Sequence, residues 1–264
     1  MIRKPIASST RAWSLIGAVT LSSAILLGLP GTAMAAEEGA SQASPDFRFS
    51  SPNNTFGLRA GWVLNRADSD IYEFVSDLLT LESSSFNGPA FAIDFGWKIA
   101  NRLDAVIGFE YSHRKRRSEY RDYVDENDIP IVQDSSLTQV PLTLSLKFYL
   151  VDRGEAVGQY AWVPAKVVPY IGGGAGMVYY KFEQVGEFVD FIDLTIFNDV
   201  FTSDGWTPAA HAFAGMDINL SPSLGLILEG RYQWASADMR GSFVGFEPID
   251  LTGLRLMGGV SWKF

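Results

Sequence analysis

The sequence contains no cysteine and only two histidines. Disulfide bonds and thiol chemistry are therefore excluded, and a zinc site is not expected, because structural zinc takes four Cys or His ligands. After residue 35 there is no uninterrupted apolar run of about 18 residues, which excludes a membrane-spanning helix in that part of the chain. The net charge of −9 disfavours nucleic acid as a partner. We expect no metal and no cofactor.

The N-terminal segment has the pattern of a secretory signal peptide. Basic residues precede an apolar run over residues 13–29, and Ala33-Met34-Ala35 fits a small-residue cleavage site. We expect residues 1–35 to be removed. The alternative, an N-terminal membrane anchor, needs a longer apolar run. Residues 36–54 are rich in Ser, Ala, Glu, Asn and Pro, and are expected to form a flexible periplasmic arm.

From residue 55 onward, apolar residues alternate with small or polar ones in segments close to the ~9–11 residues of a tilted membrane-spanning strand. In residues 137–150, for example, Leu144 and Leu146 share one face while Thr143 and Ser145 share the other. The segments run over about 55–66, 90–98, 103–113, 137–150, 169–180, 207–220, 224–234 and 254–264. The predicted fold class is all-β: an eight-stranded antiparallel transmembrane β-barrel over residues 55–264.

The connections between these segments alternate in length. Long ones fall at about 67–89, 114–136, 183–206 and 236–249, and short ones at 99–102 and 221–223. This asymmetry is typical of long extracellular loops and short periplasmic turns. The connection at 151–168 is longer than a periplasmic turn should be. The aromatic and acidic segment 183–206 predicts either a hairpin that extends its two strands above the membrane or an amphipathic segment over the barrel mouth.

A soluble sandwich or lipocalin-like barrel would also show alternation. Two features favour the membrane. The polar face is rich in Gly, Ala and Ser as well as charge, which suits a narrow packed lumen. The apolar face carries aromatic residues near strand ends, as in an interfacial girdle. These aromatic residues are Trp62, Trp97, Tyr111, Trp234 and Trp262.

These features together resemble a known family. The leader, the alternating strands, the segment Pro169-Tyr170-Ile171-Gly172-Gly173-Gly174-Ala175-Gly176 and the final Trp262-Lys263-Phe264 resemble small outer-membrane barrels of the OmpA, OmpX, OmpW and opacity-protein type. The resemblance covers nearly the whole chain after the leader and implies a location in the outer membrane of a Gram-negative bacterium. It also implies that Phe264 is the signal read by the barrel assembly machinery.

The polar faces carry charges that we expect to interlock as ion pairs in the lumen, because an unpaired charge in a low-dielectric interior is costly. They are Arg59, Asp94, Lys98, Asp104, Glu110, Lys147, Asp217, Glu229, Arg231, Arg255 and Lys263. The favoured interpretation is a structural plug, since the interior of an eight-stranded barrel is just wide enough for its side chains. The alternative is a gated polar path for small solutes.

Two further sets of residues are candidates for binding or catalysis. The basic run Arg114, Lys115, Arg116 and Arg117 is either part of a solvated loop or a contact for lipopolysaccharide phosphates, which Arg and Lys bind well. The two histidines, His113 and His211, are expected to be structural. Ser112 precedes His113, but neighbouring residues of a strand point to opposite faces, and no motif brings a serine, a histidine and an acid together.

The favoured function is therefore a non-catalytic outer-membrane protein with a structural or surface-interaction role in the cell envelope. Its expected partners are outer-membrane lipid and lipopolysaccharide, with any small solute or host ligand unidentified. The first alternative is a narrow porin-like channel for small or hydrophobic solutes. A lipid-modifying barrel enzyme is the less favoured alternative.

Overall fold

The computed structural model describes residues 47–158 and 161–264. The predicted signal peptide and residues 36–46 of the predicted arm lie outside the described residues. Residues 47–53 are held by backbone hydrogen bonds: Arg48 and Trp162 pair in both directions, and the Asn53 N–H donates to the Phe264 carbonyl. The flexibility of the arm, residues 36–54, stays a prediction.

Eight antiparallel strands form a closed hydrogen-bonded ring, which confirms the predicted fold class. They are β1 (Asn54–Asn65), β2 (Gly88–Ala100), β3 (Leu103–Val124), β4 (Pro130–Tyr149), β7 (Val167–Val189), β8 (Ile196–Asn219), β9 (Leu224–Ala237) and β11 (Gly253–Lys263). Each strand pairs with the next one in this order, and β11 pairs with β1 from Lys263 opposite Thr55 to Gly253 opposite Asn65. A closed ring leaves no edge of unpaired backbone groups, which is the condition for strands to cross lipid.

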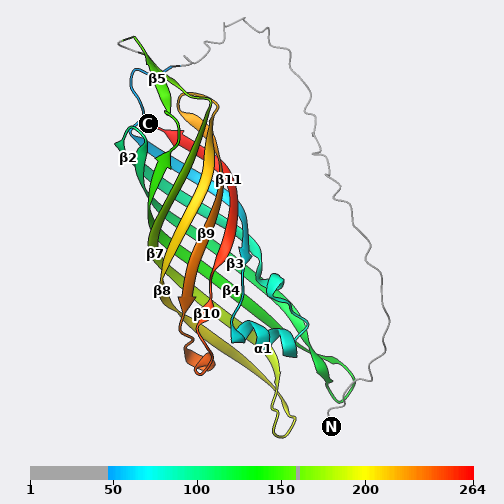
Figure 1. Ribbon diagram of the computed structural model, residues 1–264. Helices are drawn as coiled ribbons and strands as arrows, with labels where there is room; N and C mark the ends of the chain where they lie inside the picture. The colour runs from blue at the N-terminus through cyan, green and yellow to red at the C-terminus, as the bar shows by residue number, and fades with distance from the viewer. Residues whose placement is uncertain (1–46, 159–160) are drawn as a thin grey trace, which may run out of the picture. The chain divides into compact units, whose positions relative to one another are not determined.

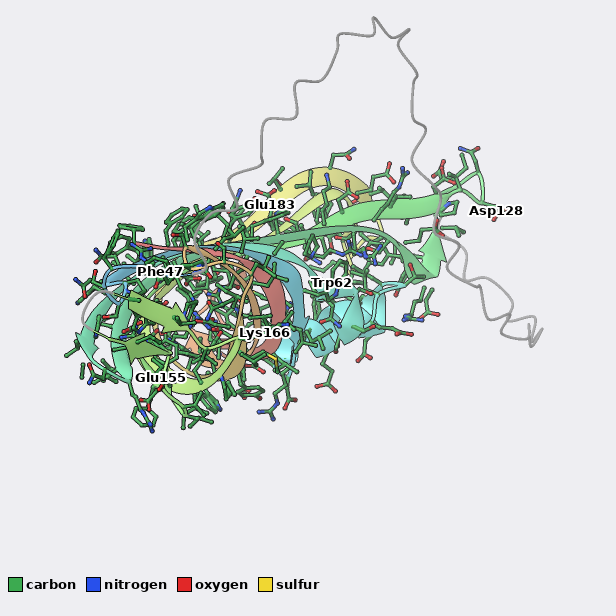
Figure 2. The ribbon with its side chains drawn as sticks, turned by 90° about the horizontal axis from the view of Figure 1, so that it is seen from above. Phe47, Trp62, Asp128, Glu155, Lys166 and Glu183 are labelled. Carbon is green, nitrogen blue, oxygen red and sulfur yellow. The ribbon has the colours of Figure 1, made fainter. Side chains whose placement is uncertain are left out.

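The two ends of the ring differ in what they carry (Figure 1). The loop end carries α1 (Asp70–Leu78), η1 (Ser83–Phe86), η2 (Gly241–Phe243) and β10 (Ile249–Asp250). The opposite end, here called the turn end, carries the C-terminus and the short turns that follow β2 and β8. Figure 2 shows Asp128, at the tip between β3 and β4, far from Phe47, Glu155 and Lys166 of the turn end.

Two of the predicted long loops are strands instead. β3 and β4 continue to a turn at residues 125–129, and β7 and β8 continue to a turn at residues 190–195. The prediction of loops at 114–136 and 183–206 was therefore wrong for most of their length. Of the two expectations for residues 183–206, the extended hairpin is confirmed.

The extensions differ from the rest of each strand in the side of the sheet that carries the apolar residues. In the middle of β4, Leu142 and Leu144 point outward and are exposed, whereas nearer the loop end Ile131 and Leu137 point inward and are buried. Alternation continues through the strand, but its sense reverses. Apolar side chains face outward where lipid surrounds the barrel, and they face the protein interior where water surrounds it.

The outer surface between the two ends is an apolar belt. Phe91, Leu144 and Leu228, each at least half exposed, lie on three different strands of it. Aromatic residues border the belt on both sides, and register places each group near one level. Toward the loop end they are Trp62, Tyr111, Tyr179, Trp206 and Trp234, and toward the turn end they are Phe56, Phe95, Trp97, Phe148 and Trp262. Two such borders are the girdles of a barrel that crosses a membrane.

No helix among the described residues is long and apolar enough to cross a membrane.

The connection between β4 and β7 is a small two-stranded sheet at the turn end. β5 (Gly154–Val157) pairs with β6 (Ala161–Pro164), and Trp162 of β6 is almost fully buried. The connection also directs Arg153 toward Asp104 in the lumen, where their closest atoms are 2.9 Å apart. The connection is longer than a simple turn because it forms this hairpin, and it also contributes the charge of Arg153 to the lumen.

We expect Leu144→Arg to destabilise the barrel in lipid by ~2–4 kcal/mol, because it places a charge on the belt near mid-membrane. Val132→Arg lies on the same face of β4 beyond the loop-end girdle, and should cost only ~0–1 kcal/mol. Urea unfolding of both variants in phospholipid vesicles measures the difference. Equal losses of unfolding free energy would contradict the assigned position of the belt.

Candidate functional site

The central ion-pair cluster of the lumen is built around Arg59 and Glu229. Arg59 donates through Nε and Nη2 to the two Asp94 oxygens, at 2.6 and 2.8 Å, and through Nη1 to Glu229. Arg231 Nη2 lies 3.0 Å from Glu229 Oε1, and the Tyr170 hydroxyl donates to Glu229 Oε2 at 3.0 Å. Every charge in this cluster therefore has an opposite partner, which a buried charge requires.

A second cluster lies on the loop-end side of the first. Arg255, which is fully buried, donates from Nε to Glu110 Oε1 at 2.7 Å and from Nη2 to Gln139 Oε1 at 2.8 Å. The Gln139 amide in turn donates to Asn65 Oδ1 at 2.9 Å. This chain of contacts links β11, β3, β4 and β1 across the lumen.

A third cluster lies near the turn end. Asp217 accepts from Lys147 Nζ at 3.1 Å, and Lys263 Nζ lies 3.7 Å from its other oxygen. Beside it, Asp104 accepts from Arg153 and from the Tyr149 hydroxyl, both at 2.9 Å.

The structure thus brings all but one of the predicted lumen charges into ion pairs. The exception is Lys98, which has no ion-pair partner in the described part of the chain and whose Nζ donates to Ser51 Oγ at 3.0 Å. Arg153 belongs to the network, but the sequence analysis missed it. It lies on the connection before β5 rather than on a strand face, so no alternation could have assigned it to the lumen.

The clusters leave little space between them. A cavity of about 40 Å³ remains beside Arg59, Glu229 and Tyr170. A single buried water needs roughly 10–15 Å³ measured in this way, so the cavity holds at most a few waters. This packing favours the plug over the polar path.

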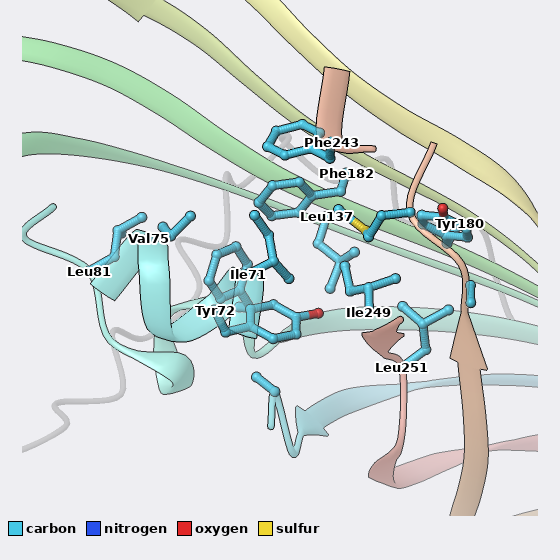
Figure 3. Packing of buried hydrophobic residues seen from close by; sticks show 14 of the residues in the cluster. Ile71, Tyr72, Val75, Leu81, Leu137, Tyr180, Phe182, Phe243, Ile249 and Leu251 are labelled. Carbon is cyan, nitrogen blue, oxygen red and sulfur yellow. The ribbon is translucent and has the colours of Figure 1, made fainter. Parts of the chain in front are cut away.

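An apolar cluster, here called the cap, closes the loop end. Ile71, Tyr72 and Val75 of α1 pack with Phe182 of β7 and Phe243 of η2 (Figure 3). The Tyr72 ring lies 6.4 Å from that of Phe182, which lies 5.2 Å from that of Phe243. The Tyr72 hydroxyl donates to the Asp250 carbonyl at 3.1 Å, and burial raises the pKa of this phenol.

Helix α1 was not foreseen, although the sequence carries a signal for it. Ile71, Val75 and Leu78 recur at spacings of four and three residues, which is the period of a helix with one apolar face. Asp70 and Glu73 in its first turn favour a helix start. The strand pattern predicts a loop here, because the segment connects two strands.

The two histidines lie in different surroundings. His113 is exposed on β3 and its Nδ1 is 2.9 Å from Thr138 Oγ1, whereas His211 is buried in the lumen with Nε2 2.8 Å from Ser145 Oγ. His211 Nδ1 has no hydrogen-bond partner within the described residues. Nor do the described residues contain a group of three or more His, Asp or Glu that could hold a metal ion.

The basic run at 114–117 is divided between two faces, because it lies on a strand. Register and alternation place Lys115 and Arg117 on the outer face with His113, while Arg114 and Arg116 lie on the inner face. Lys115 Nζ is 3.0 Å from Asp134 Oδ2 on β4. The four residues therefore do not form the single outward cluster that a loop would allow.

The C-terminal residue is fixed at the turn end. The Phe264 carbonyl accepts hydrogen bonds from the N–H groups of Asn53 and Asn54, at 3.0 and 2.8 Å. Its half-exposed ring lies 6.4 Å from the ring of Phe95.

Removing one partner of the buried Arg255–Glu110 pair should be more damaging than removing both. We expect Glu110→Ala to lower the unfolding free energy by ~3–5 kcal/mol, because Arg255 keeps an uncompensated charge, while the double change Glu110→Leu with Arg255→Met recovers most of the loss. Lys98→Met, at a base outside the ion pairs, should cost less than about 1 kcal/mol. Urea titrations in vesicles test this, and additive losses in the double variant would show that the two side chains do not interact.

No family model matches the sequence, and no curated protein matches it either. Among solved structures, the chain is similar to Neisserial surface protein A, with 14% identity and a TM-score of 0.44 over 80% of this chain and 96% of that one. It is also similar to the attachment invasion locus protein of Yersinia pestis, with 13% identity, a TM-score of 0.39 and coverage of 80% and 99%. The Escherichia coli outer membrane protein W matches with 18% identity, a TM-score of 0.32 and coverage of 81% and 99%.

Proposed function

We propose that the protein is a sealed outer-membrane barrel of a Gram-negative bacterium, whose role is carried by its loop end at the cell surface and not by transport through its lumen. The observation that carries this proposal is the closure of the lumen in two tiers. Three ion-pair clusters occupy the membrane-spanning part, and the apolar cap covers them at the loop end.

A solute on its way through the lumen would have to separate these groups. Arg59 alone contacts Asp94 and Glu229 through three nitrogen atoms, and Arg255 is held by Glu110 and Gln139. Breaking one buried pair leaves a charge without a partner in a low-dielectric site, at a cost of several kcal/mol. Such a lumen supports a structural or surface-interaction role over the channel alternative.

Conductance measurements test whether the lumen is sealed. We expect the full-length mature protein to show no stable openings in planar lipid bilayers, because the clusters leave no continuous water path. A general porin reconstituted in the same membranes controls for insertion. Reproducible openings of constant conductance in the wild-type protein would overturn the sealed barrel and favour the narrow channel.

For the loop end, we propose a contact with lipopolysaccharide through Lys115 and Arg117. Both lie on the outer face of β3 past Tyr111 of the loop-end girdle, on the side where the headgroups of lipopolysaccharide would border the barrel. Arg and Lys suit phosphate because of charge-assisted hydrogen bonds. Arg114 and Arg116 are not part of the proposed contact, because they lie on the inner face of β3.

We expect Arg117→Gln to weaken lipopolysaccharide binding about fivefold, since a basic side chain near an anionic lipid surface contributes ~1 kcal/mol. Arg116→Gln is the matched control, because it makes the same change on the opposite face of β3 and should have little effect. Binding of purified lipopolysaccharide to the barrel in neutral-lipid nanodiscs measures both. Equal losses in the two variants would point to general charge rather than to the outer face.

The proposal also includes Phe264 as the residue that the barrel assembly machinery reads. The Phe264 side chain is half exposed at the turn end, where the barrel assembly machinery would have access to it. The resemblance to small outer-membrane barrels supports this role for the residue.

A further inference from the structure

We propose that a cavity in the cap binds a small aromatic molecule, about the size of two fused rings, that carries one hydrogen-bond donor. The cavity lies between α1, η2 and the extensions of β3, β4, β7 and β8, and has a volume of about 290 Å³. This inference goes beyond the sealed barrel and its lipid contact, because it concerns a separate site and a soluble ligand.

The walls of the cavity are largely aromatic. Phe188 lies 4.4 Å from Phe201, and Phe243 lies 6.4 Å from Phe201 and 6.1 Å from Phe246, measured between ring centroids. Phe74 of α1 lies 5.3 Å from Phe246, edge to face. Aromatic rings that already meet at these distances offer both faces and edges to another ring, and such pairs add to the gain from simple burial.

The floor and the rim of the cavity differ in exposure. Leu79, Phe188 and Phe243 at its floor are each less than 7% exposed, whereas Phe74 and Phe191 at its rim are 43% and 52% exposed. Phe74 and Phe191 border one cavity, and contiguous apolar surface that faces water is typical of binding sites. A ligand can therefore enter from the aqueous side of the loop end, without crossing the lumen.

One polar group in the cavity wall is unsatisfied. Gln133 of β4 is 3% exposed, and its Oε1 has no hydrogen-bond partner among the residues that the structure describes. Tyr120 of β3 lines the same cavity, and burial raises the pKa of its phenol. A buried carbonyl oxygen without a partner is costly, so the site gains most from a ligand that donates one hydrogen bond to it.

The volume sets the size of the ligand. An engineered apolar cavity of about 150 Å³ binds benzene. The cap cavity is about twice as large, which suits two fused rings. The unpaired acceptor, Gln133 Oε1, then favours a ligand whose ring system carries a hydroxyl or N–H over a ligand with acceptors alone.

The probe is 1-naphthol, compared with 1-methoxynaphthalene, which has the same rings but no donor. We expect the full-length mature protein in nanodiscs to bind 1-naphthol about five- to tenfold more tightly than the ether, by calorimetry corrected for uptake by empty nanodiscs. Gln133→Met keeps the approximate side-chain volume and removes the acceptor. It should bring 1-naphthol down to the affinity of the ether and leave the ether unchanged.

A second variant tests the cavity itself. Ser242 is exposed and lines the cavity, so Ser242→Trp should fill the entrance and abolish binding of both probes without disturbing the buried cap. Retained binding in Ser242→Trp, or equal affinity of the wild-type protein for the two probes, would overturn the proposal. Because the cavity is separate from the lumen, these results do not depend on the conductance of the barrel.

Discussion

The reversal of the apolar face along β3, β4, β7 and β8 is the constraint on which the architecture rests. A strand that passes from lipid into water must turn its apolar side chains from the outer surface to the interior, or expose them to the wrong solvent. Both orientations occur on β4, where Leu144 is exposed on the outer surface and Ile131 is buried in the interior. The inward apolar residues of the extensions then need something to pack against, and α1, η2 and β10 supply it.

This constraint produces an interior with two tiers. In the membrane the inward face is left to polar groups, because the apolar residues face lipid, and a narrow lumen forces those groups to pair. Beyond the girdle the inward face is apolar and cannot remain open to water. The ion pairs of Arg59 and Arg255 are therefore covered at the loop end by a hydrophobic cluster that includes Tyr72 and Phe182.

The sequence predicts the membrane part of this design well and the cap poorly, for one physical reason. Alternation with apolar residues outward identifies all eight strands and the inward position of charges such as Glu229 and Arg231. It does not identify partners, because register and cross-lumen distance depend on closure of the ring. It also fails along the strand extensions, where apolar residues such as Ile131 and Leu137 of β4 face inward, and the sequence therefore predicts loops there. Arg153 and α1 lie in connections, where strand alternation carries no information.

The two tiers also separate the charged lumen from the surface of the loop end. No residue of the ranges 47–158 and 161–264 lines both the lumen cavity beside Glu229 and the cap cavity beside Phe243. A ligand that enters among the exposed rings at the loop end meets the packed cap beneath them, and that cap stands between it and the Arg255–Glu110 pair. Binding at the surface therefore need not disturb a lumen charge. The same fold can keep a lumen filled by ion pairs and leave its outer end free to recognise a ligand.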